Sequence, residues 1–134
     1  MGTILLGYDG SEASKKAIDK VVSLIKPQDE LIVVSIVPLP TLKEFAEFDP
    51  ELSKARALES VNSAIANLKE RGLKVIGLVR EGDIAEEILK LGNELNCDLI
   101  ALGDRGLSKV STFALGSVTE KVMRYAKKPV LVVK

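Results

Sequence analysis

The chain reads LIALGDRG at residues 99–106, and after nine more residues Gly116-Ser117 leads into VTEKVMRYA at 118–126. This order is typical of a strand, a glycine-marked loop and a helix N-terminus. Glycine has no Cβ, so its backbone can approach a ligand closely. A helix N-terminus offers unpaired N–H groups and a positive dipole end, and both favour phosphate. The stretch therefore predicts an anion site, and a nucleotide phosphate is the anion that it favours.

Strands alternate with helices along the rest of the chain. We expect strands at 3–8, 31–37, 73–79, 99–102 and 130–133, and helices at 13–25, 51–71, 84–95 and 117–127. Residues 38–50 have the pattern of a loop, with a short helical turn near 43–47. The alternation predicts a parallel sheet with helices on both faces. The nearly continuous apolar strands fit burial on both faces of that sheet.

The composition is that of one globular domain. With 134 residues, of which 46% are apolar and 28% are charged, the chain can bury a proper core. We therefore expect residues 1–134 to form a single domain. In the long second helix, the apolar spacing places Leu58, Val61, Ile65 and Leu68 on the buried face.

The composition also excludes several functional classes. The 19 basic and 19 acidic residues give no net charge and no basic cluster with interleaved aromatics, which argues against binding of nucleic acid. The lack of histidine removes Ser-His-Asp and Cys-His catalysis and histidine metal sites, and we predict no metal ligands. The single cysteine, Cys97, is expected to pack in the core. No apolar run has membrane-spanning length, so we expect a cytoplasmic protein that does not bind membranes.

Two loops are predicted to meet at one crevice. In an open doubly wound sheet, ligands bind at the carboxyl ends of the strands, where the strand order reverses. The common orders for five strands are 2-1-3-4-5 and 3-2-1-4-5, and in the second order strands 1 and 4 are neighbours. Those strands precede Gly7-Tyr8-Asp9-Gly10-Ser11 and Gly103-Asp104-Arg105-Gly106. The motif and the topology therefore indicate the same site.

The sequence resembles the universal stress protein family along essentially its whole length. The resemblance is carried by ILLGYDGS at 4–11, EGDIAEEI at 81–88 and residues 103–133. The last piece matches the family's nucleotide signature, with Gly103, two residues, Gly106, nine residues and Gly116-Ser117. The resemblance implies an α/β fold with an open doubly wound, Rossmann-like sheet of five parallel strands in the order 3-2-1-4-5. It also implies the ATP-binding branch of the family.

The resemblance further implies which residues would bind ATP. Around the nucleoside, Asp9 would lie near the ribose, Gly7 and Tyr8 near the adenine, and Ile36 would form an apolar wall. Around the phosphates, the loop would be shaped by Gly103, Arg105 and Gly106, and N–H groups would come from Gly116, Ser117 and Val118. A divalent ion such as Mg²⁺ could bridge phosphate oxygens without a dedicated protein cage.

Three of these signals also have a purely structural interpretation. Ser117-Val118-Thr119-Glu120 fits a capping box. Ser11 fits a cap of the first helix, and Asp9 fits a turn that ends the first strand.

Three functions remain open at this point. The first is a regulatory protein that binds ATP and then acts on an unidentified protein partner. It is favoured because the predicted phosphate site has no evident catalytic base beside it. The second is a slow ATPase or self-phosphorylating enzyme, although no Walker A motif is present. Its hydroxyls would come from Ser108, Ser111, Thr112, Ser117 and Thr119. The third is an interaction module without nucleotide, which applies if Asp104 repels phosphate instead of pairing with Arg105 or Lys109.

Two surfaces indicate partners. Val130–Val133 is an apolar strand at a sheet edge, where another chain could pair. The family resemblance implies a two-fold homodimer through this strand. In the loop after the second strand, Phe45 and Phe48 either fold against their own domain or form a partner surface.

Overall fold

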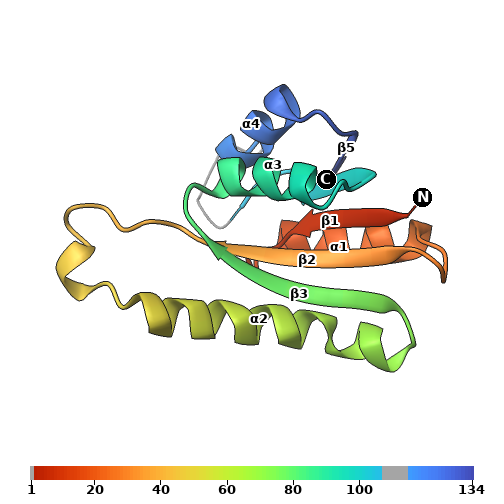
Figure 1. Ribbon diagram of the computed structural model, residues 1–134, viewed down its shortest axis with the longest axis horizontal. Helices are drawn as coiled ribbons and strands as arrows, with labels where there is room; N and C mark the ends of the chain where they lie inside the picture. Colours follow the sequence, from red (N-terminus) through yellow and green to blue (C-terminus); the bar gives the residue numbers. More distant parts are fainter. Residues whose placement is uncertain (1, 107–114) are drawn as a thin grey trace.

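The computed structural model describes residues 2–106 and 115–134, and within them five parallel strands form one sheet (Figure 1). The strands are β1 Thr3–Gly7, β2 Glu30–Val37, β3 Lys74–Glu81, β4 Leu99–Gly103 and β5 Val130–Val133. Their order is β3-β2-β1-β4-β5. This order and the parallel pairing of every neighbouring pair confirm the predicted doubly wound sheet of order 3-2-1-4-5.

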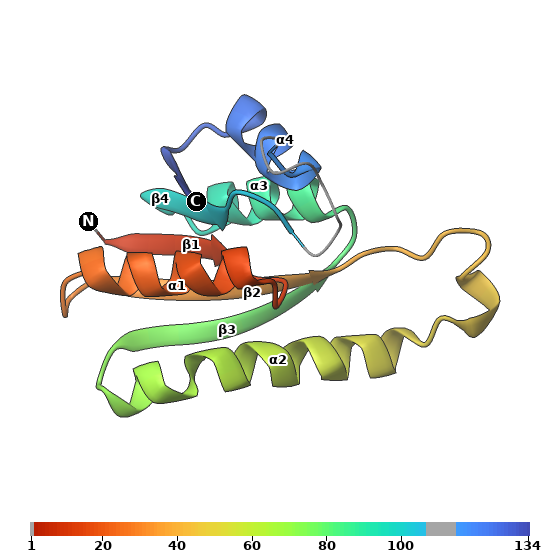
Figure 2. The ribbon, with the colours of Figure 1, turned by 180° about the vertical axis from the view of Figure 1, so that it is seen from behind.

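Helices cover both faces of the sheet (Figures 1 and 2). They are α1 Glu12–Leu24, α2 Pro50–Glu70, α3 Ile84–Glu94 and α4 Ser117–Tyr125. Core residues of α1 and α2 pack on one face, and core residues of α3 and α4 pack on the other. In the part of the chain that is described, no helix is both long and apolar enough to cross a membrane.

The inner strands bury residues on both of their faces. In β1, Ile4 and Leu6 face α1 and α2, whereas Leu5 faces α3 and α4. All three are fully buried, which explains why the strand reads as a continuous apolar run. Cys97 packs in the core on the α3 and α4 side as predicted. Burial raises the pKa of its thiol above the ordinary value.

The buried face of α2 differs from the prediction at one residue. Val61, Ile65 and Leu68 are buried as expected, but Leu58 is 44% exposed. The inward stripe continues from Val61 to Ala57, one turn earlier, and Ala57 lines a cavity. Leu58 is therefore turned toward solvent.

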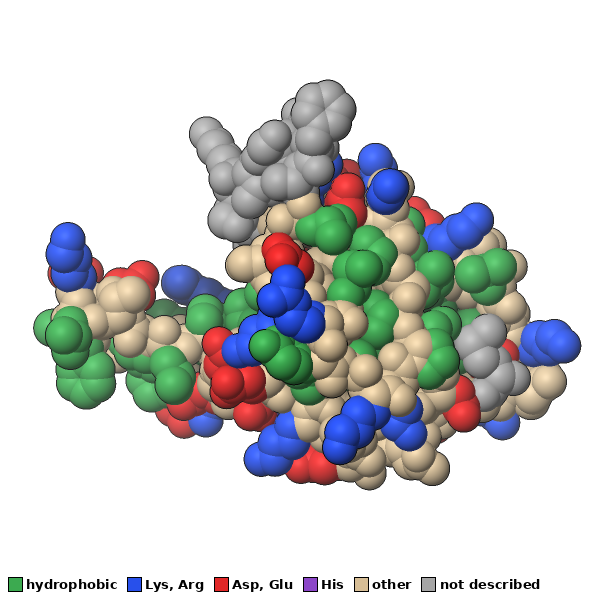
Figure 3. Space-filling view, turned by 90° about the horizontal axis from the view of Figure 1, so that it is seen from above, with side chains coloured by type: hydrophobic (Ala, Val, Ile, Leu, Met, Phe, Trp, Pro, Cys, Tyr) green, Lys and Arg blue, Asp and Glu red, His purple; other side chains and the backbone are tan. Residues whose placement is uncertain are grey.

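The chain between β2 and α2 projects from the body of the molecule, and we name residues 38–49 the arm (Figures 1 and 3). Two reciprocal hydrogen bonds fix its turn. The Glu44 N–H donates to Oγ1 of Thr41 over 3.3 Å, and the Thr41 N–H donates to Oε1 of Glu44 over 2.9 Å. The predicted helical turn is a 3₁₀ turn, η1 Phe45–Glu47. Phe45 is 71% exposed, so it does not fold against its own domain.

Candidate functional site

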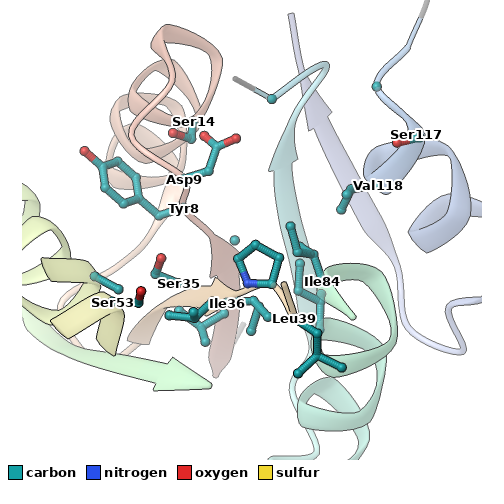
Figure 4. A pocket seen from close by; sticks show the side chains of 18 of the residues that line it. Tyr8, Asp9, Ser14, Ser35, Ile36, Leu39, Ser53, Ile84, Ser117 and Val118 are labelled. Carbon is teal, nitrogen blue, oxygen red and sulfur yellow. The ribbon is translucent and has the colours of Figure 1, made fainter. Parts of the chain in front are cut away.

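A cavity of about 830 Å³ opens at the carboxyl ends of β1, β2 and β4, where the strand order reverses (Figure 4). Every residue that the sequence predicts to bind nucleotide lines this cavity. These residues are Gly7, Tyr8, Asp9, Ile36, Gly103, Arg105, Gly106, Gly116, Ser117 and Val118. The fold thus brings separate segments of the chain to the position where open parallel sheets bind ligands.

Glycine is required where the loop after β4 passes its neighbours. A Cβ added to Gly106 would lie 2.7 Å from Oδ2 of Asp9. A Cβ added to Gly116 would lie 3.0 Å from the Cα of Arg105, and one added to Gly103 would lie 2.6 Å from the backbone of Ala13. These segments pass in direct contact, so backbone forms the wall of the cavity here. We name this part, formed by Gly103, Gly106 and Gly116, the glycine wall.

Helix α4 begins beside the glycine wall without a side-chain cap. Gly116 is the N-cap residue, with φ −65° and ψ 151°, and Ser117 is the first residue of the helix. The capping-box interpretation of Ser117 is therefore wrong, because the cap position belongs to a residue that has no side chain to accept a hydrogen bond. Ser117 and Val118 line the cavity. The first N–H groups of α4 are consequently available to a ligand there.

Two hydrogen bonds hold the start of α4 against the end of β4. The Gly116 N–H donates to the Asp104 carbonyl over 2.8 Å. The Thr119 hydroxyl donates to the Gly103 carbonyl over 2.8 Å, and Thr119 is only 4% exposed. The Thr119 hydroxyl is therefore a structural group. Ser108, Ser111 and Thr112, the other candidates for self-phosphorylation besides Ser117, lie outside the described residues.

Asp9 forms the turn that follows β1 and also lines the cavity. Its Oδ1 accepts a hydrogen bond from the Ser11 N–H over 2.9 Å, which confirms the turn interpretation. Ser11 in turn caps α1, because its hydroxyl accepts from the Ser14 N–H over 3.1 Å. The other carboxylate oxygen of Asp9, Oδ2, is the atom that lies beside Gly106. The turn thus holds a carboxylate in the lining of the cavity.

Asp104 pairs with its neighbour in the chain. Its Oδ2 lies 3.3 Å from a guanidinium nitrogen of Arg105, and its N–H donates to the Val133 carbonyl over 3.0 Å. Arg105 lines the cavity, whereas Asp104 is not among the lining residues. Of the two alternatives for this carboxylate, the structure therefore has the paired one. Lys109, the other predicted partner, lies outside the described residues.

Apolar side chains form another part of the lining, which we name the apolar wall. Ile36 of β2 is joined there by Leu39 of the arm and by Ile84 and Ile88 of α3 (Figure 4). Ile36 was predicted to meet the adenine, and the α3 residues lie in the segment 81–88 that carries the family resemblance. These side chains offer a surface that suits the flat face of a base.

Ion pairs join α3 to α4 at the rim, beside a smaller cavity of about 340 Å³. The Lys121 ammonium lies 3.4 Å from carboxylate oxygens of both Asp83 and Glu86. Asp83 also caps α3, and the Glu86 N–H, followed by Lys121, lowers the Asp83 pKa. Burial alone would lower the Lys121 pKa, but Glu86 and Asp83 outweigh it and raise that pKa.

Sequence reasoning missed the part of the cavity that the arm and α2 supply. These further lining residues include Lys43, Glu44, Glu47, Phe48, Ser53 and Arg56. The arm was identified only as an irregular loop, and the start of α2 only as helix. No spacing in the sequence indicates that these segments turn back toward the ends of β1 and β2, because that depends on where the whole helix packs.

The chain is similar to known proteins in sequence. The model of the Universal stress protein family matches residues 1–134. A putative universal stress protein of Staphylococcus aureus (strain USA300) is 33% identical over 137 residues, which cover 98% of this chain and 82% of that protein.

Two solved structures are similar over nearly the full chain. Hypothetical protein MJ0577 is 31% identical with a TM-score of 0.84, and the match covers 99% of this chain and 95% of that one. A universal stress protein solved in complex with cAMP is 25% identical with a TM-score of 0.73, and the match covers 98% of this chain and 95% of that one.

Proposed function

The chain belongs to the universal stress protein family, and from this premise we propose that it is a regulatory protein that binds ATP in the cavity described above. The observation that carries the proposal is the glycine wall beside the uncapped start of α4. Exposed N–H groups and the positive end of a helix dipole favour phosphate. The cAMP complex of a similar protein supports an adenine nucleotide as the ligand.

In the proposed complex, each part of ATP meets a different wall. The triphosphate lies along Gly106 and Gly116-Ser117, with Arg105 as the nearby cation of the loop. The Asp9 carboxylate accepts hydrogen bonds from ribose hydroxyls. The adenine packs on Ile36 near Gly7 and Tyr8, because the cavity is apolar at this side. Mg²⁺ would enter with the phosphates, since it usually keeps several waters and binds phosphate oxygens.

A ligand in this cavity would contact residues of the arm. Leu39, Lys43 and Phe48 of the arm line the cavity, while Leu42 and Phe45 of the same arm are 97% and 71% exposed. Exposed apolar side chains gathered on a projecting segment are typical of a partner surface (Figure 3). A nucleotide that contacts the arm could therefore change how this surface is presented to a protein partner.

We also propose a homodimer through β5. This strand stands at the edge of the sheet and pairs with β4 on one side only among the described strands. An apolar edge strand favours pairing with a second chain. Light scattering at micromolar concentration should give the mass of two chains, and the mass of one chain would contradict this part of the proposal.

Calorimetric titration with ATP and Mg²⁺ tests the nucleotide proposal, after mass spectrometry of any nucleotide that is carried through purification. We expect micromolar binding by the wild type. We expect none by Gly116→Val, whose Cβ would meet the Arg105 backbone and whose side chain would fill the phosphate position. Circular dichroism of the variant shows whether it is folded. If the wild type neither binds nucleotide nor carries it through purification, the ATP proposal is wrong and an interaction module without nucleotide is favoured. Rapid release of phosphate would instead favour a slow ATPase.

A further inference from the structure

The cavity continues past Asp9 to the side of the sheet that α2 covers, and we name this part the α2-side lobe. It is lined by Tyr8, Ser35, Ser53, Arg56 and Ala57. Figure 4 shows that Tyr8, Ser35 and Ser53 lie on one side of the cavity, whereas Ile84 and Val118 lie on the other. The lobe therefore lies away from Ile84 of α3 and from the start of α4.

The lobe presents hydrogen-bond donors that the described protein leaves unused. Within residues 2–106 and 115–134, the hydroxyls of Tyr8, Ser35 and Ser53 have no hydrogen-bond partner, and Arg56 has no ion pair. Tyr8 is only 7% exposed, and Ser35 and Ser53 are half-buried. These hydroxyls reach solvent in the cavity, since Glu81 Oε2 is the one fully buried side-chain oxygen without a hydrogen-bond partner in the described residues. A ligand in the lobe would give these hydroxyls a partner.

The position of these donors is fixed by the fold. Tyr8 follows β1, and its N–H donates to the Val34 carbonyl of β2 over 2.8 Å. Ser35 lies on the face of β2 opposite to Ile36, since side chains alternate along a strand. Ser53 and Arg56 are three residues apart in α2 and so share one face of that helix. Three elements thus direct donors into one lobe.

We propose that the α2-side lobe binds a phosphate carried on the ribose, so that adenosine 3′,5′-bisphosphate binds more tightly than ADP, its isomer with both phosphates at the 5′ position. This inference rests on the proposed function, because it needs the ribose at Asp9 and the 5′ phosphate at the glycine wall. The proposal directs the 3′ position of this ribose toward the lobe and leaves the 2′ hydroxyl to donate to the Asp9 carboxylate. Hydroxyl and guanidinium groups are the donors that phosphate oxygens accept from.

The charges around the lobe are mixed, since the cation Arg56 lies in it and the Asp9 carboxylate lies beside it. Its own lining side chains carry one charge, the positive charge of Arg56. Glu44 and Glu47 of the arm line the same cavity. The Glu44 carboxylate accepts from the Thr41 N–H, a bond that lowers its pKa and directs that oxygen to the arm's own backbone. Lys43 of the arm adds a further positive charge against these two glutamates.

Adenosine 3′,5′-bisphosphate and ADP provide a direct test, because they are isomers that differ in where the second phosphate is attached. In calorimetric titrations of the full chain, we expect the 3′,5′-bisphosphate to bind about tenfold more tightly than ADP. The Arg56→Gln and Ser53→Ala variants should remove this preference while ADP affinity stays unchanged. Arg71→Gln, which removes a charge from the exposed far end of the same helix, should keep the preference.

The outcomes separate the two proposals. Equal affinity for the two isomers, or a preference that Arg56→Gln leaves intact, would overturn the α2-side lobe while ATP binding still stands. Absence of binding by ADP, ATP and the bisphosphate alike would overturn the proposed function and the lobe together. Thermal unfolding measurements show whether both variants are folded. We expect both to fold, since Arg56 is exposed and alanine at position 53 favours a helix.

Discussion

Gly106 lies so close to Asp9 that a Cβ on the glycine would come within 2.7 Å of the aspartate Oδ2. The loop after β4 and the loop after β1 therefore meet in the lining of the cavity, although they are almost a hundred residues apart in the chain. The backbone of Gly106 does not need the left-handed conformation, since no positive φ occurs there. The missing side chain at Gly106 therefore leaves room for the Asp9 carboxylate.

We expect Gly106→Ala to lower ATP affinity by roughly tenfold, because the added methyl displaces the Asp9 carboxylate from its position. The free energy of unfolding should change by less than about 0.5 kcal/mol, since only a side-chain end has to move. Calorimetry and chemical denaturation measure the two effects. An unchanged affinity in the folded variant would show that the approach of these two loops is not used for binding.

Two substitutions of Asp9 distinguish its structural role in the turn after β1 from its proposed role as an acceptor for the ribose hydroxyls. Asp9→Asn keeps an oxygen that can accept from the Ser11 N–H, whereas Asp9→Ala removes it. Both variants should bind ATP at least about tenfold more weakly, because a charged acceptor for the ribose hydroxyls is lost. Only the alanine variant should also lose about 1 kcal/mol of stability. If Asp9→Asn binds ATP as tightly as the wild type, Asp9 does not contact the ribose and acts only as a turn residue.

Thr119 offers a test of how α4 is held at the cavity. Its buried hydroxyl donates to the Gly103 carbonyl over 2.8 Å. Thr119→Val removes the donor and should cost about 1–3 kcal/mol in chemical denaturation, since the carbonyl is left without its partner. ATP affinity should fall with it, because the first turn of α4 is no longer fixed against β4. Thr119→Ser keeps the hydroxyl and should retain most of both properties.

The fold could be predicted from the sequence because its signals are local. Ile4, Leu5 and Leu6 are buried on two faces and so read as a strand without alternation. The cap of α3 is local as well, since the Asp83 carboxylate accepts from the N–H of Glu86 three residues later. The spacing from Gly103 to Gly116-Ser117 likewise identified the glycine wall. At each of these glycines, the missing Cβ lets a neighbouring segment come close.

The remaining parts of the site depend on packing between distant segments. Ser53 and Arg56 look like ordinary residues of a helix start, and only the placement of α2 beside β2 turns them into lining residues. Ser117 was open to two interpretations, a helix cap and a contact to phosphate, because a serine at a helix start suits either. Gly116 occupies the cap, and the hydrogen bond to the Asp104 carbonyl that fixes it there is invisible in the spacing.

Acid should weaken the attachment of the N-terminal strand through Asp29. This buried carboxylate accepts hydrogen bonds from the Gly2 N–H and the Lys26 N–H, each over 2.9 Å. The Gly2 bond, followed by the Lys26 bond, lowers the Asp29 pKa from 3.8 to about 2. Because the pKa is lower in the folded state, the stabilisation is fully present above pH 3.8 and is lost as the pH falls toward 2.

We therefore expect Asp29→Asn to lower Tm at pH 5 to 7, because the amide group cannot accept both hydrogen bonds as the carboxylate does. The difference in Tm between this variant and the wild type should shrink as the pH is lowered from about 4 to about 2, where the wild-type carboxylate becomes protonated. Asp19→Asn removes the same charge from an exposed position on α1, so its Tm should follow the wild type throughout. A difference for Asp29→Asn that stays constant over this range would mean that the carboxylate charge does not hold the strand.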